Sequence, residues 1–212
     1  MQSVCFRAMG QVVLFGDSIT WGSADPIGGG WAGRLRVAGW NAVDRVNPGN
    51  GDYVTVDNCG ISGDTVGGVL ARFDVEAAAR QPEVIVFAIG INDVPRDDLP
   101  GTPLDVLELQ MEALLTAARA MADVVVVTAT NVDETRSEHD YRNSDIALVN
   151  EVIRRTGAAA RVVVVDVYGL LADADLLPDG LHPGPEGHQK MFDVIGPVVM
   201  SQPALHRFRT AE

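Results

Sequence analysis

The chain has 212 residues, of which 47% are apolar, so it can enclose one substantial hydrophobic core but is short for two. Acidic residues outnumber basic ones by 29 to 16, and the formal charge of −13 is spread along the sequence, which argues against nucleic acid and anionic membranes as partners. Lys190 is the only lysine, which disfavours a lysine Schiff base or a P-loop. We predict a single globular domain over residues 1–212.

The two cysteines indicate a reducing compartment. Cys5 and Cys59 are too few for a disulfide framework, and Cys59 ends an apolar run, where a buried free thiol is the ordinary interpretation. No apolar stretch approaches the roughly 20 residues that a membrane-spanning helix needs. We therefore expect a soluble, cytoplasmic protein without stable membrane insertion, while a signal segment removed from a precursor stays open.

Short runs rich in β-branched residues alternate along the chain with segments of helical periodicity. Continuous apolar runs of this length are typical of strands that are buried on both faces of a sheet. The alternation predicts an α/β fold in which helices cover both sides of a parallel sheet. In chain order, the elements are strands at 12–15 and 54–56, a helix at 65–79, a strand at 84–88, a helix at 103–121, a strand at 124–128, a helix at 144–156, a strand at 162–167 and a last helix after Pro183.

Residues that begin or end helices support these boundaries. Asp64 or Thr65 can cap the first of the three delimited helices, and Pro103 can occupy the first turn of the second. Gly157 can close the third, because glycine is common just past a helix end.

Three stretches have the composition of loops, namely 22–30, 49–52 and 130–143. Residues 28–33 also match the dinucleotide-binding pattern Gly-x-Gly-x-x-Gly. A dinucleotide site would follow its strand immediately, whereas here about a dozen residues intervene. We therefore interpret 28–33 as a flexible loop that leads into a helix.

Polar or glycine-bearing segments follow four of the predicted strands. In an open α/β sheet, ligands bind beyond the carboxyl ends of the strands, because these ends meet at one rim. A serine, an asparagine, an aspartate and a histidine are therefore expected at one place although they are far apart in the chain. The segments are Gly16-Asp-Ser18, Asn-Cys-Gly-Ile-Ser-Gly-Asp-Thr at 58–65, Gly-Ile-Asn-Asp at 90–93 and Asp-Gly-Leu-His-Pro at 179–183.

These residue types fit acyl transfer. The hydroxyl of Ser18 is a weak nucleophile until a neighbouring base takes its proton, and His182 is the natural base, since imidazole titrates near neutral pH. Asp179 is close enough in sequence to orient that ring and to stabilise the imidazolium. The tetrahedral oxyanion needs preorganised donors, and the backbone N–H groups of Ser18 and Gly63 together with the side-chain amide of Asn92 can supply three.

The four segments resemble the sequence blocks of the SGNH/GDSL hydrolases, in the order of that family and over nearly the whole chain. The resemblance implies a flavodoxin-like three-layer α/β/α sandwich with a central five-stranded parallel sheet. It also implies ester hydrolysis without metal or cofactor, a catalytic triad of Ser18, His182 and Asp179, and an oxyanion hole formed by Ser18, Gly63 and Asn92. Gly60 is the main rival of Gly63, and the family's Ser-Gly-Asp-Thr pattern favours Gly63.

Other residues near these segments have structural interpretations. Asp17 is expected to hold its turn by accepting backbone N–H bonds, and Asp93 to do the same in an Asx turn. His188 is expected on the last helix, since its spacing from His182 matches no common metal pattern. Five apolar residues line either an acyl pocket or the core: Trp21, Ile61, Ile91, Val94 and Leu181.

Two competing functions come from other classes. A metal-dependent phosphoesterase would use Asp17, Asn92, Asp179 and His182 as ligands, but one histidine is a thin ligand set for a catalytic transition metal. A non-catalytic flavodoxin-like binding module would have no reason to assemble a serine, a histidine, an aspartate and oxyanion donors. A carboxylesterase or lipase-like acyl hydrolase is the favoured prediction.

The particular ester is left open by the sequence. Small-molecule, lipid and sugar esters all fit, including thioesters, lysophospholipids and acetylated sugars. No inserted lid is evident, so we expect an open site for short or medium acyl chains unless the loop at 130–143 covers it. The oligomeric state is undetermined.

Overall fold

The computed structural model describes residues 9–46, 53–97, 99–137 and 139–208, and in them five parallel strands form one sheet. The strands stand in the order β2-β1-β3-β4-β5. The predicted α/β fold with a central five-stranded parallel sheet is therefore confirmed. Its strands are β1 (Met9–Gly16), β2 (Tyr53–Gly60), β3 (Val84–Ala88), β4 (Asp123–Val127) and β5 (Val163–Val165).

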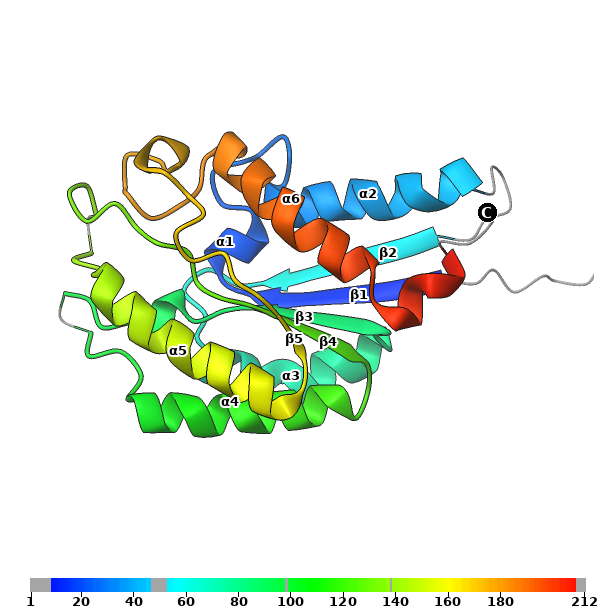
Figure 1. The fold of residues 1–212 in the computed structure, drawn as a ribbon, viewed down its shortest axis with the longest axis horizontal. Coiled ribbons are helices and arrows are strands. Elements are labelled where there is room, and N and C mark those ends of the chain that lie inside the picture. The colour runs from blue at the N-terminus through cyan, green and yellow to red at the C-terminus, as the bar shows by residue number, and fades with distance from the viewer. Residues whose placement is uncertain (1–8, 47–52, 98, 138, 209–212) are drawn as a thin grey trace, which may run out of the picture.

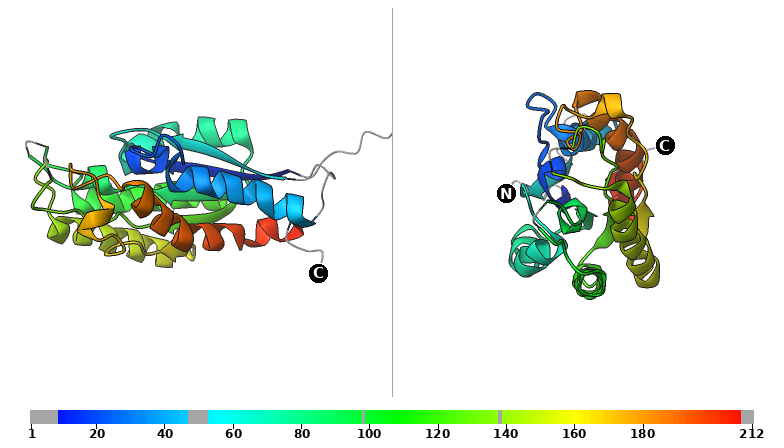
Figure 2. Two further views of the ribbon diagram at one scale, coloured as in Figure 1. Left: turned by 90° about the horizontal axis from the view of Figure 1, so that it is seen from above. Right: turned by 90° about the vertical axis from the view of Figure 1, so that its left-hand side faces the viewer.

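Helices cover both faces of the sheet and complete a three-layer sandwich, with α2 and α6 on one face and α3, α4 and α5 on the other (Figures 1 and 2). The strand order explains this division. The chain moves from β1 outward to β2, then back past β1 to β3 and on to β5, and right-handed crossovers in opposite directions place their helices on opposite faces. The helices are α1 (Ser18–Trp21), α2 (Gly30–Val46), α3 (Val66–Arg80), α4 (Leu104–Arg119), α5 (Asn143–Ala160) and α6 (Pro185–Met200).

The change of direction between β1 and β3 determines where a site can form. The helices that follow these two strands lie on opposite faces, and in open α/β sheets ligands bind at the carboxyl ends of the strands at such a point. This rim faces the viewer in the right-hand view of Figure 2. Ser18 follows β1 after Asp17, and a 3-10 turn at Ile91–Asp93 closely follows β3, so two of the predicted segments lie at this rim.

Burial on both faces accounts for the continuous apolar composition of the inner strands. Phe15 of β1 and Phe87 of β3 are wholly buried, and their ring centroids lie 5.3 and 5.7 Å from that of Phe73 of α3. Aromatic pairs at these distances stabilise the core beyond the area that they bury. The side chains therefore fix α3 against the centre of the sheet, and α3 begins immediately after the segment that contains Gly63.

The start of α3 agrees with the boundary predicted from the sequence, whereas the end of α5 differs from it. Thr65 caps α3, with its Oγ1 accepting the N–H of Gly68 at 3.1 Å. The prediction that Gly157 closes the following helix is wrong, because α5 continues to Ala160 and Arg161 takes the left-handed conformation at its end. A Cβ on Gly157 would lie 2.5 Å from Val164 Cγ2, so this glycine allows the helix to approach β5 closely.

The glycine-rich stretch leads into α2, as predicted, but the loop before the helix is tied down. Asp25 is buried, accepts the N–H of Gly28 at 2.9 Å and forms an ion pair with Arg34 of α2. The prediction of a flexible loop is therefore wrong, because these contacts hold the loop against α2. The predicted loop at 130–143 is confirmed over its described residues up to Arg142, because α5 begins at Asn143, whereas the loop at 49–52 lies outside the described residues.

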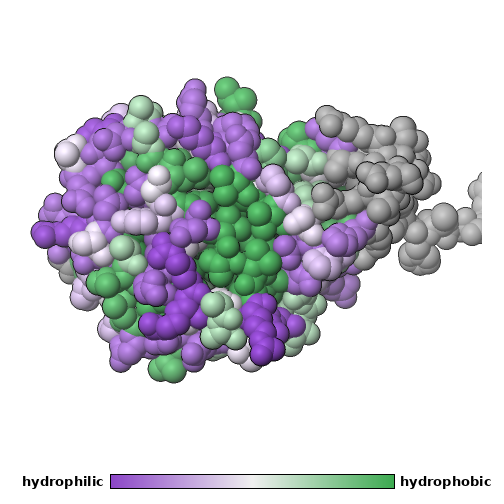
Figure 3. Space-filling model, in the orientation of Figure 1, coloured by the Kyte–Doolittle hydropathy of each residue, from purple (hydrophilic) through white to green (hydrophobic). Residues whose placement is uncertain are grey.

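A continuous apolar area is visible near the centre of the face shown in Figure 3, between α6 and β5. Of the residues in these two elements, Val163 of β5 is 41% exposed and Val194 of α6 is 36% exposed. The helices within the described ranges include none that is long and apolar enough to cross a membrane.

Candidate active site

Ser18 is held at the carboxyl end of β1 by the residues around it. The Asp17 carboxylate accepts the N–H of Ile19 at 2.9 Å and caps α1, which confirms the structural role predicted for Asp17. Thr20 Oγ1 donates to the carbonyl of Ala88 in β3 at 3.1 Å. Since α1 is tied to both inner strands, the position of the serine hydroxyl is determined by the rigid centre of the sheet.

The structure brings Ser18, His182 and Asp179 into one hydrogen-bonded chain. Ser18 Oγ lies 2.9 Å from His182 Nε2, although 164 residues separate the two. His182 Nδ1 lies 2.8 Å from Asp179 Oδ2. The serine is 7% exposed and the other two side chains are partly exposed, so the arrangement lies at the surface of the rim.

The Asp179 carboxylate also holds its own turn, because its Oδ1 accepts the N–H groups of Leu181 and His182, each at 3.0 Å. Partial burial alone would raise the pKa of Asp179, but the Leu181 N–H, the His182 ring and the His182 N–H outweigh burial, so the pKa lies below its ordinary value. The carboxylate is therefore ionised at neutral pH. An ionised carboxylate only accepts hydrogen bonds, so His182 Nδ1 carries a proton and Nε2 presents its lone pair to Ser18.

Gly180 is required at the centre of this turn. It has φ +68°, and a Cβ there would lie 2.7 Å from the Asp133 carbonyl and 2.9 Å from the Ser137 N. We expect Gly180→Ala to lower the free energy of unfolding by about 3 kcal/mol and to lower kcat, because the turn must shift together with Asp179. Gly169→Ala is the matched control, since Gly169 has φ +78° with open space around it and should lose only about 1 kcal/mol. Equal losses in urea denaturation would contradict the expectation.

The candidate oxyanion donors differ in how crowded they are. A Cβ on Gly60 would lie 2.5 Å from the Trp21 N, so Gly60 is needed for the close contact between β2 and α1. Gly63 has φ +78° and open space around its Cα, which leaves its surroundings accessible to a ligand. Asn92 Nδ2 donates to the carbonyl of Asp64 at 2.9 Å and so joins the turn that carries Gly63 to the end of β3.

Two residues that the sequence analysis did not single out contact Asn92. Arg96 Nη1 donates to Asn92 Oδ1 at 3.1 Å, and the Tyr141 hydroxyl donates to the same atom at 3.3 Å. Tyr141 comes from the 130–143 loop, so this loop does reach the site. In the sequence, an arginine and a tyrosine within polar loops carry no signal; only the proximity of Arg96 to Asn92 hints at a contact.

Asp93 is structural, as predicted, but the predicted Asx turn is wrong, because its carboxylate binds two other segments of the chain. It is fully buried, and its carboxylate accepts the N–H of Val66 at 3.0 Å and the hydroxyl of Thr102 at 2.6 Å. Burial raises the pKa of Asp93, and these two donors partly oppose that effect. Asp93 therefore joins the start of α3 to the chain after β3.

His188 lies on α6, as predicted, and serves the fold. Its Nε2 lies 3.0 Å from the Ser23 carbonyl, and its Nδ1 accepts the Trp31 N–H at 3.3 Å. One nitrogen must donate and the other accept, which describes a neutral ring. Burial lowers the pKa of His188, in agreement with this state. Within residues 9–46, 53–97, 99–137 and 139–208, no group of three or more His, Cys, Asp or Glu side chains is placed to hold a metal ion.

Burial raises the pKa of Asp17 to about 7. The unfolded chain loses this proton near its ordinary pKa of 3.8, whereas the folded chain keeps it up to about pH 7, so stability falls as the pH rises between these values. Because asparagine does not titrate, we expect Asp17→Asn to abolish this fall in the free energy of unfolding, which is on the order of 4 kcal/mol at most. Urea denaturation at pH 4.5 and pH 7.5 measures this loss, with exposed Asp74→Asn as control. Parallel pH curves for wild type and Asp17→Asn would refute it.

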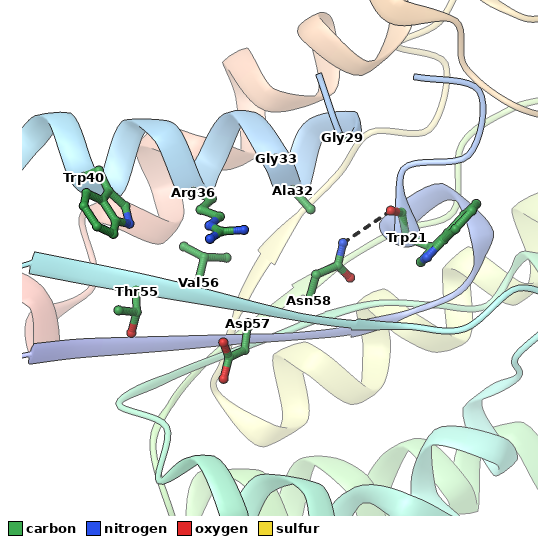
Figure 4. A pocket seen from close by; sticks show the side chains of 10 residues that line it. All are labelled: Trp21, Gly29, Ala32, Gly33, Arg36, Trp40, Thr55, Val56, Asp57 and Asn58. Carbon is green, nitrogen blue, oxygen red and sulfur yellow. Dashed lines mark hydrogen bonds between the residues drawn. The ribbon is translucent and has the colours of Figure 1, made fainter. Parts of the chain in front are cut away.

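A groove of about 470 Å³ lies beside the site, between α2 and β2 (Figure 4). Trp21 stands at its end nearest α1 and Trp40 at the other, while Ser18, His182 and Asp179 are not among its lining residues. Of the apolar residues expected near the site, Trp21 is 61% and Ile61 49% exposed. The other three are buried in the core: Ile91, Val94 and Leu181.

The whole arrangement is that of a hydrolase with a serine at the first strand end of a doubly wound sheet. Residues 14–190 match the model of the GDSL-like lipase/acylhydrolase family, so the chain belongs to this family of ester-acting hydrolases, as the sequence blocks predicted.

Related proteins carry esterase names. An "Acetylxylan esterase" of Geobacillus stearothermophilus is 30% identical over 198 residues, which cover 84% of this chain and 89% of that protein. An "Arylesterase" of Vibrio mimicus is 25% identical over 196 residues, or 91% of this chain and 90% of that protein. A "Multidomain esterase" of Ruminococcus flavefaciens is 28% identical over 215 residues, and this chain spans only 27% of its length.

Solved structures share the fold. A lipase/acylhydrolase from Enterococcus faecalis superposes with a TM-score of 0.76 at 24% identity, covering 90% of this chain and 95% of that one. An acetylxylan esterase from Geobacillus stearothermophilus gives a TM-score of 0.69 at 24% identity, covering 97% and 96%. At this identity the likeness supports the fold alone.

Proposed function

We propose that this chain hydrolyses carboxylic esters through an acyl-enzyme on Ser18, with His182 as general base and acid and Asp179 as its orienting carboxylate. The observation that carries the proposal is the continuous chain of hydrogen bonds from Ser18 Oγ through both ring nitrogens of His182 to Asp179. A serine used only as a helix cap or turn residue has no need of an oriented imidazole.

In the proposed mechanism each proton has a path. Ser18 Oγ attacks the ester carbonyl carbon while its proton passes to His182 Nε2, and the imidazolium is stabilised by Asp179. The oxyanion is received by the N–H groups of Ser18 and Gly63 and by the Asn92 amide. Collapse breaks the bond to the alcohol oxygen, which takes the proton from Nε2. Water then gives its proton to Nε2, attacks the acyl carbon and releases the acid, and Ser18 recovers its proton.

Covalent labelling tests the nucleophile. A fluorophosphonate probe should modify the protein once per chain, with Ser18 as the modified residue in mass spectrometry. Ser18→Ala should be unlabelled and inactive toward p-nitrophenyl acetate. Modification at another residue, or full esterase activity in Ser18→Ala, would end the serine-hydrolase proposal.

We further propose that the substrate carries a short acyl group. The exposed positions of Trp21 and Ile61 describe an open rim, and two relatives are named for acetylxylan and aryl esters. The specificity constant is expected to fall along a series of p-nitrophenyl esters from acetate and butyrate to long chains. A larger value for a long-chain ester would mean that the rim binds extended acyl chains and would contradict the proposal.

We also propose a reducing, cytoplasmic setting. Cys59 is a buried free thiol whose pKa burial raises to about 11, so it is protonated and unreactive at neutral pH. The supporting observation is the free thiol of Cys59, the form in which a reducing compartment keeps cysteines. Fractionation of the producing cell, with detection of the chain in the cytoplasmic or the secreted fraction, tests this setting.

A further inference from the structure

The side-chain amide of Asn92 is held at both ends. Its Oδ1 accepts hydrogen bonds from Arg96 Nη1 at 3.1 Å and from the Tyr141 hydroxyl at 3.3 Å, and Arg96 also donates to that hydroxyl. Its Nδ2 donates to the Asp64 carbonyl at 2.9 Å. Within the described part of the chain, this is the single acceptor for Nδ2, so one amide hydrogen is left for a ligand.

The partners of Asn92 allow only one orientation of the amide. A guanidinium has donors and no acceptor, so the atom that faces Arg96 must be the amide oxygen. A backbone carbonyl only accepts, so the atom that faces Asp64 must be the amide nitrogen. Rotation of the amide by 180° would place two donors together and two acceptors together. The Tyr141 hydroxyl alone would not impose this choice, because it can donate or accept.

The same contacts strengthen the remaining N–H as a donor. The positive charge of Arg96 beside Oδ1 polarises the amide, and chains of hydrogen bonds reinforce one another in a partly buried setting. Tyr141 is 1% exposed, and burial raises the pKa of its phenol, which stays protonated and able to donate. The Arg96 guanidinium lies over the Tyr141 ring at 5.3 Å from its centroid, so each side chain also fixes the other.

We propose that Arg96 and Tyr141 are positioning residues for ester hydrolysis, which orient and polarise the Asn92 amide so that its free N–H meets the developing oxyanion. The inference rests on the proposed function, in which Asn92 is an oxyanion donor. Through Tyr141, the 130–143 loop then has a role in turnover that differs from that of a lid over the acyl chain.

A purely structural role for the network would be to clamp two loops together, and the structure provides a control for it. Asp97 and His139 lie beside Arg96 and Tyr141 in the same two loops, and their side chains meet at 3.4 Å without a bond to Asn92. Asp97→Asn weakens this second link between the loops. If clamping is the whole role of the network, Asp97→Asn should resemble the variants of Arg96.

The experiment compares kcat and KM for p-nitrophenyl acetate in Arg96→Met, Arg96→Lys, Tyr141→Phe and Asp97→Asn. Methionine keeps the unbranched apolar stem of arginine but donates nothing, whereas lysine keeps a charged donor. We expect Arg96→Met to lower kcat about 30-fold and Tyr141→Phe about 5-fold, less than the 10²- to 10³-fold typical for loss of a whole oxyanion donor. KM should change less than about threefold, Arg96→Lys should recover part of the loss, and Asp97→Asn should retain full kcat.

The decisive step repeats Arg96→Met and Tyr141→Phe in an Asn92→Ala background. If both residues act only through the Asn92 amide, neither should lower kcat further, because their target is gone. Three results would overturn this inference while leaving Ser18 labelling intact. The first is a further loss of kcat when Arg96→Met or Tyr141→Phe is added to Asn92→Ala, and the second is a loss in Asp97→Asn equal to that in Arg96→Met. The third is an unchanged kcat in Arg96→Met although Asn92→Ala is impaired. Full activity in Asn92→Ala would overturn it together with the oxyanion assignment. Failure of Ser18 labelling would instead overturn the proposed function.

Discussion

Ser18→Ala and His182→Ala are each expected to lower kcat on the order of 10⁶-fold, and the double variant is expected to lose no more than either single one. Ser18 Oγ and His182 Nε2 are 2.9 Å apart, so one proton transfer requires both groups. Once the base is absent, the hydroxyl is an ordinary alcohol, and removing it costs little more. Single-turnover and steady-state rates with p-nitrophenyl acetate for the three variants measure this saturation.

Ser201→Ala and His206→Ala are matched controls, because these residues also form a serine and histidine pair, at the opposite end of the sheet, through the Ser201 carbonyl and His206 Nε2. Their kcat should equal that of the wild type. If the losses in Ser18→Ala and His182→Ala multiply in the double variant, the two residues act independently. The chain would then use another base for the nucleophile, even if it hydrolyses esters.

The layered architecture was predictable because burial on both faces leaves a strong signal. The strands β3 and β4 have near-continuous valine and isoleucine, and the sequence placed them to within a residue. The strand β5 is shorter than predicted, because Asp166 leaves the sheet to accept the Thr128 hydroxyl and an Arg154 N–H. The helix α1 has four residues, too few for a periodic pattern, so sequence reasoning found its serine but not its helix.

The sequence predicts those parts of the candidate site that directly follow strands of the sheet. Ser18 and the 90–93 segment follow adjacent parallel strands, so topology alone brings them together. The bond from His182 to Asp179 follows from their spacing in a glycine turn. The contacts of Asn92 with Arg96 and Tyr141 depend instead on the paths of two loops, and loop composition does not encode which side chains meet. The bonds of His188 depend in the same way on the loop at 22–30.

Asp179→Asn is expected to lower kcat by about 10²- to 10⁴-fold without unfolding the turn, and by no more than His182→Ala. The asparagine oxygen can still accept the N–H groups of Leu181 and His182, which the carboxylate receives at 3.0 Å. Its NH₂ group then faces His182 Nδ1, where the carboxylate oxygen stood at 2.8 Å. A donor at that place favours the tautomer that carries its proton on Nε2, and such a ring cannot take the proton of Ser18.

The control for Asp179→Asn is Asp166→Asn. The Asp166 carboxylate also accepts the backbone N–H of the residue two positions later, that of Tyr168, at 3.1 Å. Both variants should keep the far-ultraviolet circular dichroism of the wild type, and only Asp179→Asn should lose kcat. Burst kinetics add a second measurement, since acylation and deacylation both need the same tautomer and both should slow. A wild-type kcat in Asp179→Asn would mean that the Asp179 carboxylate holds the turn and contributes nothing to proton transfer. His182 would then be oriented by the backbone alone, and the triad proposed above would reduce to a dyad of Ser18 and His182.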